Sequence, residues 1–331
     1  MNTFGRIFRV HIFGESHGES VGIVIDGVPA GLPITEDDLL PDLERRKGGK
    51  QKGTTPRQEA DYPFFKSGIF NGKATGAPIT IIFENNNTRS GDYEKQRSFP
   101  RPGHADFVAH EKYGGNEDFR GGGHFSARLT TGLVAAGAIA KKMMQGVTIH
   151  SEVTEIGGEK DLEKGLQNAI DAKDSVGGLV ECRVNGLPIG LGEPFFDSVE
   201  SNIAHIAFAI PAVKGVEFGS GFAAAKMFGS QHNDAIENRE GKTTTNNAGG
   251  IVGGITNSNE LLFRIAIKPT ASTPKQQNSL NWETGKMEDF SIKGRHDLCV
   301  ALRAPVILEA ATAIALADLM MLEQCIPRIW K

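Results

Sequence analysis

Cysteine is scarce in this sequence of 331 residues, and the pattern of its few cysteines excludes several classes of protein. Cys182, Cys299 and Cys325 are far apart and odd in number, and no C-x-x-C pair occurs. Neither a structural zinc site nor a disulfide framework is indicated, and we expect no bound metal. Reduced thiols are typical of the cytoplasm, where we expect this protein to work.

Signals for export or membrane insertion are also lacking. Residues 1–6 do not contain the apolar core of a signal peptide. No apolar run approaches the length of a membrane span, so we expect no contact with a membrane.

Aromatic residues and net charge are both low. Aromatic residues make up 7% of the chain, and the net charge is −4. A surface that stacks nucleic-acid bases needs aromatic side chains among its cations, and a surface that binds the phosphate backbone is usually basic. We therefore expect no nucleic-acid partner.

Several common catalytic motifs are absent or lack their structural context. No Walker motif is present, and no G-x-G-x-x-G follows a strand and opens a helix, which argues against P-loop NTPases and Rossmann dehydrogenases. Residues 14–18 match the hydrolase pattern G-x-S-x-G, but a helix follows this turn in an α/β-hydrolase. Here the β-branched residues of 21–26 predict a strand, so the hydrolase interpretation is rejected.

Glycine, in contrast, is abundant: 41 residues are glycine, well above the usual share of about 7%. The glycines cluster without a fixed period, for example at 121–123, 249–250 and 253–254. Such clusters let the backbone approach a ligand closely. The run 121–123 leads through Ser126 and Arg128 into a predicted helix, and a glycine-rich loop at a helix N-terminus favours anions.

Three segments far apart in the sequence place a histidine beside glycine and charged residues. They contain His17 in 13–18, His104 in 101–106, and His296 with Asp297 in 294–297. Histidine titrates near working pH, which suits proton transfer. We expect the three segments to meet in one anion-binding pocket with two working histidines, His17 and His104.

A glycine-rich basic loop covers residues 45–57. It is either a solvated loop, as charge runs usually are, or a clamp on an anionic small molecule. We favour the clamp because other segments also supply cations beside glycine.

The hydrophobic pattern predicts a mixed protein of strands and helices, built as a single catalytic domain over residues 1–331. We expect strands at 9–13, 21–26, 62–70, 78–84, 147–153, 179–184 and 261–267. We expect helices from Thr35 to about 47 and at 129–144, 162–173, 199–210 and 305–322, the last in the core.

Taken in order along nearly the whole chain, these segments resemble the chorismate synthase family. Besides the histidine segments, the resemblance rests on residues 26–29, on the glycine-rich run into Ser126-Ala127-Arg128, and on 247–254 and 268–270. It implies an α+β fold, a sandwich with central helices between antiparallel sheets. It also implies a homotetramer.

The resemblance implies an activity as well. The family converts 5-enolpyruvylshikimate 3-phosphate to chorismate and phosphate by an anti-1,4-elimination, the last common step of the shikimate pathway to the aromatic amino acids. The reaction needs reduced FMN (FMNH2) although it has no net redox change, and NADPH is the indirect reductant. Whether this chain reduces its own flavin or depends on an external flavin reductase stays open.

The resemblance assigns roles to individual residues. His17 would protonate the departing phosphate, His104 would protonate or stabilise the reduced flavin, and Asp297 would assist removal of the ring proton through flavin N5. Substrate or NADP would contact the cations Arg46, Lys52, Arg101 and Arg128. The flavin would be lined by His124, Phe125, Ser126, Ala212, Gly253, Lys268, Pro269, Thr270, Ala271, Ser272 and Arg295.

Some positions depart from the family pattern. Lys52 stands where arginine is usual, which keeps the charge but loses the bidentate fork. His124-Phe125 replace a common Arg-Ser, and Leu129, Pro211 and Leu298 replace an acid, an asparagine and a proline. The departures at His124, Phe125 and Pro211 motivate one rival interpretation, a binding protein that kept the pocket but lost catalysis. A phosphatase with a histidine nucleophile, which would need no flavin, is a further rival.

Overall fold

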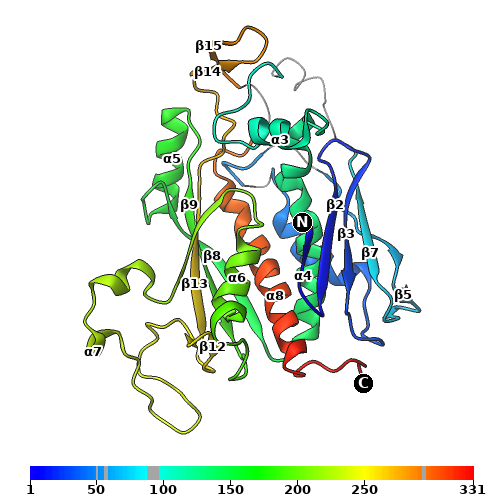
Figure 1. The fold of residues 1–331 in the computed structure, drawn as a ribbon, viewed down its shortest axis with the longest axis vertical. Helices are drawn as coiled ribbons and strands as arrows, with labels where there is room; N and C mark the ends of the chain where they lie inside the picture. The colour runs from blue at the N-terminus through cyan, green and yellow to red at the C-terminus, as the bar shows by residue number, and fades with distance from the viewer. Residues whose placement is uncertain (50, 56–58, 88–96, 293–295) are drawn as a thin grey trace.

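The fold is a sandwich in which helices lie between two antiparallel sheets (Figure 1). The computed structural model describes residues 1–49, 51–55, 59–87, 97–292 and 296–331. Within these residues, a five-stranded sheet has the order β1-β2-β3-β7-β4 and a four-stranded sheet the order β10-β13-β9-β8. The expected α+β architecture is therefore confirmed.

The first sheet is formed mainly by the N-terminal part of the chain. Its strands are β1 (Thr3–Phe4), β2 (Arg9–Gly14), β3 (Ser20–Asp26), β4 (Phe64–Ser67) and β7 (Ile79–Glu84). The second sheet follows later, with β8 (Thr148–Ile156), β9 (Gly178–Asn185), β10 (Val213–Phe218) and β13 (Leu261–Ile267). Short antiparallel hairpins pair β5 (Ile69–Phe70) with β6 (Lys73–Ala74), β11 (Ile251–Val252) with β12 (Ile255–Thr256), and β14 (Gln277–Asn281) with β15 (Lys286–Phe290).

Alternating side chains explain why these sheets cover the helices. In β13 every second residue is buried, from Leu261 through Phe263 and Ile265 to Ile267. Successive side chains of a strand point to opposite faces, so this alternation gives one apolar face to the core and leaves the other partly exposed. The sheet therefore packs against the helical layer on one side only.

Two long helices, α4 (Thr130–Met143) and α8 (Ala304–Leu322), form the centre of that layer (Figure 1). They approach very closely at Gly137, where an added Cβ would lie 2.3 Å from the Cα of Ala310. The described part of the chain also contains α1 (Leu40–Arg46), α3 (Asp106–Tyr113), α5 (Leu162–Ala172), α6 (Val199–Ala207) and α7 (Gly229–His232).

Helix α8 is apolar around most of its circumference. By length and composition, residues Val300–Leu322 could cross a membrane, with a mean hydropathy of 1.8. In the folded chain, however, 89% of the most apolar window is buried, as in a helix enclosed by a protein core. The expectation that no apolar run reaches this length is wrong, and the expectation that the last helix is core is confirmed.

Some elements differ from the sequence prediction for local reasons. The strand expected at 62–70 is interrupted at Gly68, whose positive φ of 80° turns the chain into the β5–β6 hairpin. The helix expected after Thr35 is divided into a short 3-10 helix, Glu36–Asp38, and α1, which carries Pro41 near its start. Pro41 has no N–H to continue a preceding helix, which explains the break.

Candidate active site

A cavity of about 630 Å³ opens where the N-terminal ends of α4 and α8 meet the C-terminal ends of α1 and α6. The helix N-termini carry partial positive charge, which favours an anionic ligand, whereas the C-termini of α1 and α6 carry partial negative charge, which opposes one. The described lining residues also include six arginine or lysine side chains against three carboxylates. This volume is typical of a pocket for a small molecule or cofactor.

Most of the predicted site residues line this cavity. They are Arg46, Arg101, His104, His124, Phe125, Ser126, Arg128, Ala212, Lys268, Thr270, Ala271, Ser272 and Asp297. The three histidine segments also meet here as expected, because Ser16, Gly103 and His296 belong to the same wall.

Three predicted residues lie away from the cavity wall, and a fourth cannot be placed. Lys52 donates from Nζ to Oε1 of Gln167 on α5, 2.9 Å away, and does not line the cavity. Gly253 lies in the turn between β11 and β12, and Pro269 lies beside lining residues without itself lining the cavity. Arg295 falls outside the described residues. The roles of these residues stay predictions.

His17 lies just behind the cavity wall and is only 7% exposed. The glycine-rich run covers its ring: an added Cβ at Gly121 would come within 2.4 Å of the imidazole. The Ser16 N–H donates to the carbonyl oxygen of Gly123 at 3.1 Å, which ties the two segments together. The run 121–123 has positive φ angles throughout, a conformation that favours glycine.

His104 occupies the other side of the same run, since an added Cβ at Gly122 would lie 3.2 Å from its ring. Its Nδ1 is 2.5 Å from Oδ1 of Asp106, and the other carboxylate oxygen, Oδ2, accepts from Nε of Arg101 at 2.7 Å. Burial would raise the pKa of Asp106, but the hydrogen bonds from Arg101 and His104 outweigh burial and hold that pKa well below its usual range. Asp106 therefore stays ionised and fixes both side chains.

Asp297 is held from two directions. Its Oδ1 accepts the backbone N–H of Thr55 at 2.7 Å, and its Oδ2 accepts from Nη1 of Arg303 at 3.1 Å. Arg303 also donates from Nε to the carbonyl oxygen of Arg46. The carboxylate is thus fixed where α8 begins.

His296 differs from the other histidines of the pocket. Burial and the nearby charge of Arg101 lower its pKa to about 4, so the ring is neutral at neutral pH. Its Nε2 is buried and has no hydrogen-bond partner among the described residues. A polar atom buried in this way calls for a partner from a ligand or water.

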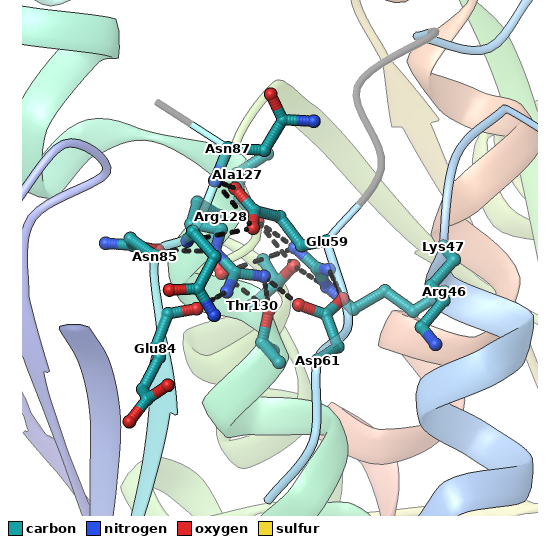
Figure 2. Close-up of polar contacts among 12 residues, drawn as sticks. Arg46, Lys47, Glu59, Asp61, Glu84, Asn85, Asn87, Ala127, Arg128 and Thr130 are labelled. Carbon is teal, nitrogen blue, oxygen red and sulfur yellow. Dashed lines mark hydrogen bonds and ion pairs between the residues drawn. The ribbon is translucent and has the colours of Figure 1, made fainter. Parts of the chain in front are cut away.

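Arg46 and Arg128 converge on the carboxylate of Asp61 (Figure 2). The Nη1 of Arg46 lies 3.2 Å from Oδ2 of Asp61, and the Nη1 of Arg128 donates to Oδ1. Burial lowers the pKa of Arg46 to about 9, and the charge of Asp61 opposes that shift. Nearby, the Glu59 carboxylate accepts the backbone N–H groups of Asn86 and Asn87.

The remaining wall suits the expected flavin. Thr270 Oγ1, like His296 Nε2, is buried without a partner among the residues described, and both residues line the cavity. Burial, with the charge of Lys214, lowers the pKa of Lys268 in the same wall. Ser272 Oγ accepts from Nη1 of Arg101 at 3.1 Å. Polar atoms that lack a partner could form hydrogen bonds with the amide groups of the FMN ring system, and a neighbouring cation could pair with its phosphate.

Sequence reasoning missed Asp61, Glu59, Thr55, Arg303 and the buried Nε2 atom of His296. Glu59 and Asp61 follow the basic loop directly, and two acids beside a run of cations were a usable signal. Arg303 had no local signal, because its partners Asp297 and Arg46 come to it only through folding.

The chain forms a sandwich of antiparallel sheets around a helical layer, with a cationic cavity that three histidine segments reach. This combination defines an enzyme that acts on a small molecule. Comparison with known proteins identifies which family. The sequence profile of the family described as "Chorismate synthase" matches residues 8–321. The chain belongs to the chorismate synthase family, whose members are lyases.

Individual relatives agree. A chorismate synthase of Chitinophaga pinensis is 68% identical over 332 residues, with 100% of both chains covered. One from Dehalococcoides mccartyi is 45% identical and covers 100% of this chain and 99% of its own. A solved structure titled "Crystal Structure of Chorismate Synthase" superposes with a TM-score of 0.74 at 27% identity, covering 96% of this chain and 93% of the other.

Proposed function

We propose that this cavity catalyses the anti-1,4-elimination of phosphate from 5-enolpyruvylshikimate 3-phosphate to give chorismate, with reduced FMN bound. The observation that carries the proposal is the convergence of His17, His104 and Asp297 with several cations around one cavity. A substrate with one phosphate and two carboxylates requires such a set of cations.

The elimination breaks a carbon–oxygen bond to phosphate and a carbon–hydrogen bond of the ring. Phosphate leaves more easily when it is protonated and surrounded by cations. His17, held behind Gly121, is the proposed proton donor to the departing phosphate. Asp297, held by Thr55 and Arg303, is the proposed final acceptor of the ring proton. The positive charges of Arg101 and Arg128 balance the charge that develops on the leaving group.

Reduced FMN, when bound, supplies electron density to the substrate transiently and is not consumed. The residues proposed to hold it are His124, Phe125, Ser126, Ala212, Lys268 and Thr270–Ser272 of the cavity wall, together with Gly253, Pro269 and Arg295. His104, fixed by Asp106, is the proposed donor to the reduced flavin. The Thr270 hydroxyl and His296 Nε2, which have no partner among the described residues, would then have polar groups of the flavin within their reach.

The proposed assembly is a homotetramer in the cytoplasm. Several large apolar side chains are strongly exposed in the isolated chain, including Phe195 at 86%, Phe196 at 92% and Phe222 at 81%. Phe195 and Phe196 are adjacent in the chain, and exposed apolar side chains that lie together are typical of protein–protein interfaces. NADPH is the proposed indirect reductant, used either by this chain or through an external flavin reductase.

Anaerobic turnover of 5-enolpyruvylshikimate 3-phosphate, with and without chemically reduced FMN, tests the proposal. Chorismate and phosphate should appear together and only with reduced FMN. Phosphate release without flavin would indicate the rival phosphatase. Binding of FMN and substrate without product would indicate the rival binding protein.

The His17→Ala variant tests the proposed proton donor. It should keep its fold and its affinity for FMN and lose most turnover, because general acid catalysis contributes roughly 10²- to 10⁴-fold. Near-normal turnover in this variant would remove His17 from the mechanism. Adding NADPH alone, and then NADPH with a flavin reductase, shows whether the chain reduces its own flavin.

A further inference from the structure

The carboxylate of Asp61 joins two buried guanidinium groups into one unit (Figure 2). The side chains of Arg46 and Asp61 are 3% and 2% exposed, and that of Arg128 is 5% exposed. Two like charges this deep in a protein are strongly unfavourable unless an opposite charge lies between them. Asp61 is that charge, since each of its oxygens accepts from a different arginine.

Most donors of the two arginines are already used within the protein. Arg46 donates from Nε to Thr130 Oγ1, from Nη2 to the carbonyl oxygens of Ala127 and Arg128, and from Nη1 to Asp61. Each guanidinium has five N–H groups, so the contacts of the described residues leave one for a ligand.

Arg128 is engaged in the same way. Its Nε donates to Asn85 Oδ1, its Nη2 to the carbonyl oxygen of Glu84, and its Nη1 to Asp61 and to Thr131 Oγ1. Four of its five donors are again taken by described residues. Neither arginine can therefore bind an anion in a bidentate manner without first breaking a hydrogen bond inside the protein.

The backbone of Asp61 supports a functional interpretation. Its φ is 51°, in the left-handed region. Residues other than glycine rarely adopt this region, although aspartate and asparagine tolerate it better than most. Retained strain of this kind often accompanies a functional constraint. The left-handed turn brings the Asp61 carboxylate between the two guanidinium groups.

We propose that Asp61 is a positioning residue that holds Arg46 and Arg128 as a rigid pair, so that one N–H of each points to the phosphate or a carboxylate of the substrate. The proposal rests on the proposed function for the identity of that substrate. For the change in anion affinity when Asp61 is neutralised, the proposal predicts the opposite sign to that expected from net charge alone. Removal of a negative charge beside an anion should tighten binding by Coulomb's law, whereas loss of a positioning residue should weaken it.

The decisive variant is Asp61→Asn, which keeps the size of the side chain and its tolerance of the left-handed backbone. Binding of 5-enolpyruvylshikimate 3-phosphate, and separately of inorganic phosphate, is measured by calorimetry on the full chain loaded with oxidised FMN, so that no turnover occurs. The matched control is Asp26→Asn, because Asp26 pairs with Arg9 on the exposed surface. The affinity for FMN is measured for all three proteins.

We expect Asp61→Asn to bind both anions about tenfold to hundredfold more weakly, with the affinity for FMN retained, and Asp26→Asn to behave as the wild type. Equal or tighter anion binding by Asp61→Asn would overturn the proposal, because Asp61 would then only offset charge. In turnover assays, positioning predicts a raised KM with a smaller change in kcat.

A second variant keeps the proposal testable if Asp61→Asn does not fold. Asp61→Glu retains the charge but displaces the carboxylate by one methylene. A positioning role predicts weaker phosphate binding by this variant, whereas a role in charge neutralisation alone predicts unchanged phosphate binding. Unchanged phosphate binding by Asp61→Glu would overturn the proposal. Failure of the proposed function and failure of the role of Asp61 can be told apart. Absence of turnover in the wild type would reject the proposed function, whereas the affinities for inorganic phosphate test the role of Asp61 without any turnover.

Discussion

The backbone of Gly121 lies directly against the imidazole ring of His17, so closely that a methyl group on Gly121 would come within 2.4 Å of the ring's Cδ2. Because the glycine has no side chain, the glycine-rich run leaves room for the histidine ring. This is a second role for the run, in addition to any binding of an anion by its N–H groups. Gly122 stands in a similar, looser relation to His104. One short run thus sets the places of both proposed catalytic histidines.

Gly121→Ala should abolish most turnover while the protein still folds. The new methyl group displaces the His17 ring, and the φ of +60° adds backbone strain of about 1 kcal/mol. The expected loss is roughly 10²-fold or more in kcat, comparable to that of His17→Ala. Steady-state kinetics with reduced FMN, together with urea unfolding, measures both effects.

Gly146→Ala is the matched control. Its φ is +81° and nothing lies within 4 Å of an added Cβ, so it carries the backbone strain without the contact to a histidine. It should be destabilised to a similar extent and keep full turnover. Equal losses of turnover in the two variants would show that strain, and not displacement of His17, is responsible.

The elements and site segments that the sequence predicted are those with a recognisable pattern in neighbouring residues. Strands such as β3 and β13 have β-branched or alternating apolar residues, and each of the three histidine segments places glycine and charge close to a histidine in the sequence. These features were therefore found. Helix α3 buries only Ala109, so it has no apolar stripe to indicate it. The polar hairpin of β14 and β15 was missed for the same reason.

The parts of the site that were missed are those that folding creates. Asp61 meets Arg46 from 15 residues away and Arg128 from 67 residues away. Nothing in the local pattern of Asp61 distinguishes it from an exposed acid. The anion binding expected of Arg46 and Arg128 is also more restricted than their charge suggested. Asp61, together with other side chains and backbone carbonyls, already accepts four of the five N–H groups of each arginine.

Gly137→Ala should destabilise the fold although alanine is the better helix former. An added Cβ would meet the Cα and Cβ of Ala310 at 2.3 Å, so α4 and α8 must separate. Overpacking of this kind costs about 1–3 kcal/mol, more than the helix propensity gained. Gly229→Ala, in helix α7 with nothing within 4 Å, is the control and should be neutral. A wild-type midpoint for Gly137→Ala in urea would contradict the close approach of the helices.

Asp318→Asn should release the segment that precedes β2. The Asp318 carboxylate is 3% exposed and accepts the backbone N–H groups of Arg6 at 2.8 Å, Ile7 at 2.7 Å and Phe8 at 2.9 Å. Loss of this charged acceptor should lower the free energy of unfolding by about 2–5 kcal/mol. Hydrogen exchange at these three amides should accelerate most. Asp26→Asn, at an exposed ion pair, should change stability by less than about 1 kcal/mol; a similar loss in both variants would remove the special role of Asp318.

His296 should make the protein less stable as the pH falls below 6.5. Its pKa is lowered in the folded state to about 4 by burial, by Arg101 and by His104, against the opposing charge of Asp297. Between these values the unfolded chain binds a proton that the folded chain does not, so stability decreases as the pH falls and is unaffected by this group above about 6.5. The full effect amounts to up to about 3 kcal/mol near pH 4.

Urea unfolding of the wild type and of His296→Gln at pH 7 and pH 4.5 measures this effect. Carboxylates also contribute to the acid sensitivity in this range, but they are common to both proteins and cancel in the comparison. Because glutamine does not titrate, the variant should lose less stability on acidification than the wild type does. The imidazole signal of His296 in NMR should titrate near pH 4 in the folded wild type. The contrary result would be equal acid sensitivity of the two proteins together with an imidazole signal that titrates near 6.5. It would mean that solvent reaches the ring and protonates it in the folded protein. His296 would then not be a neutral group whose Nε2 is buried in the cavity wall.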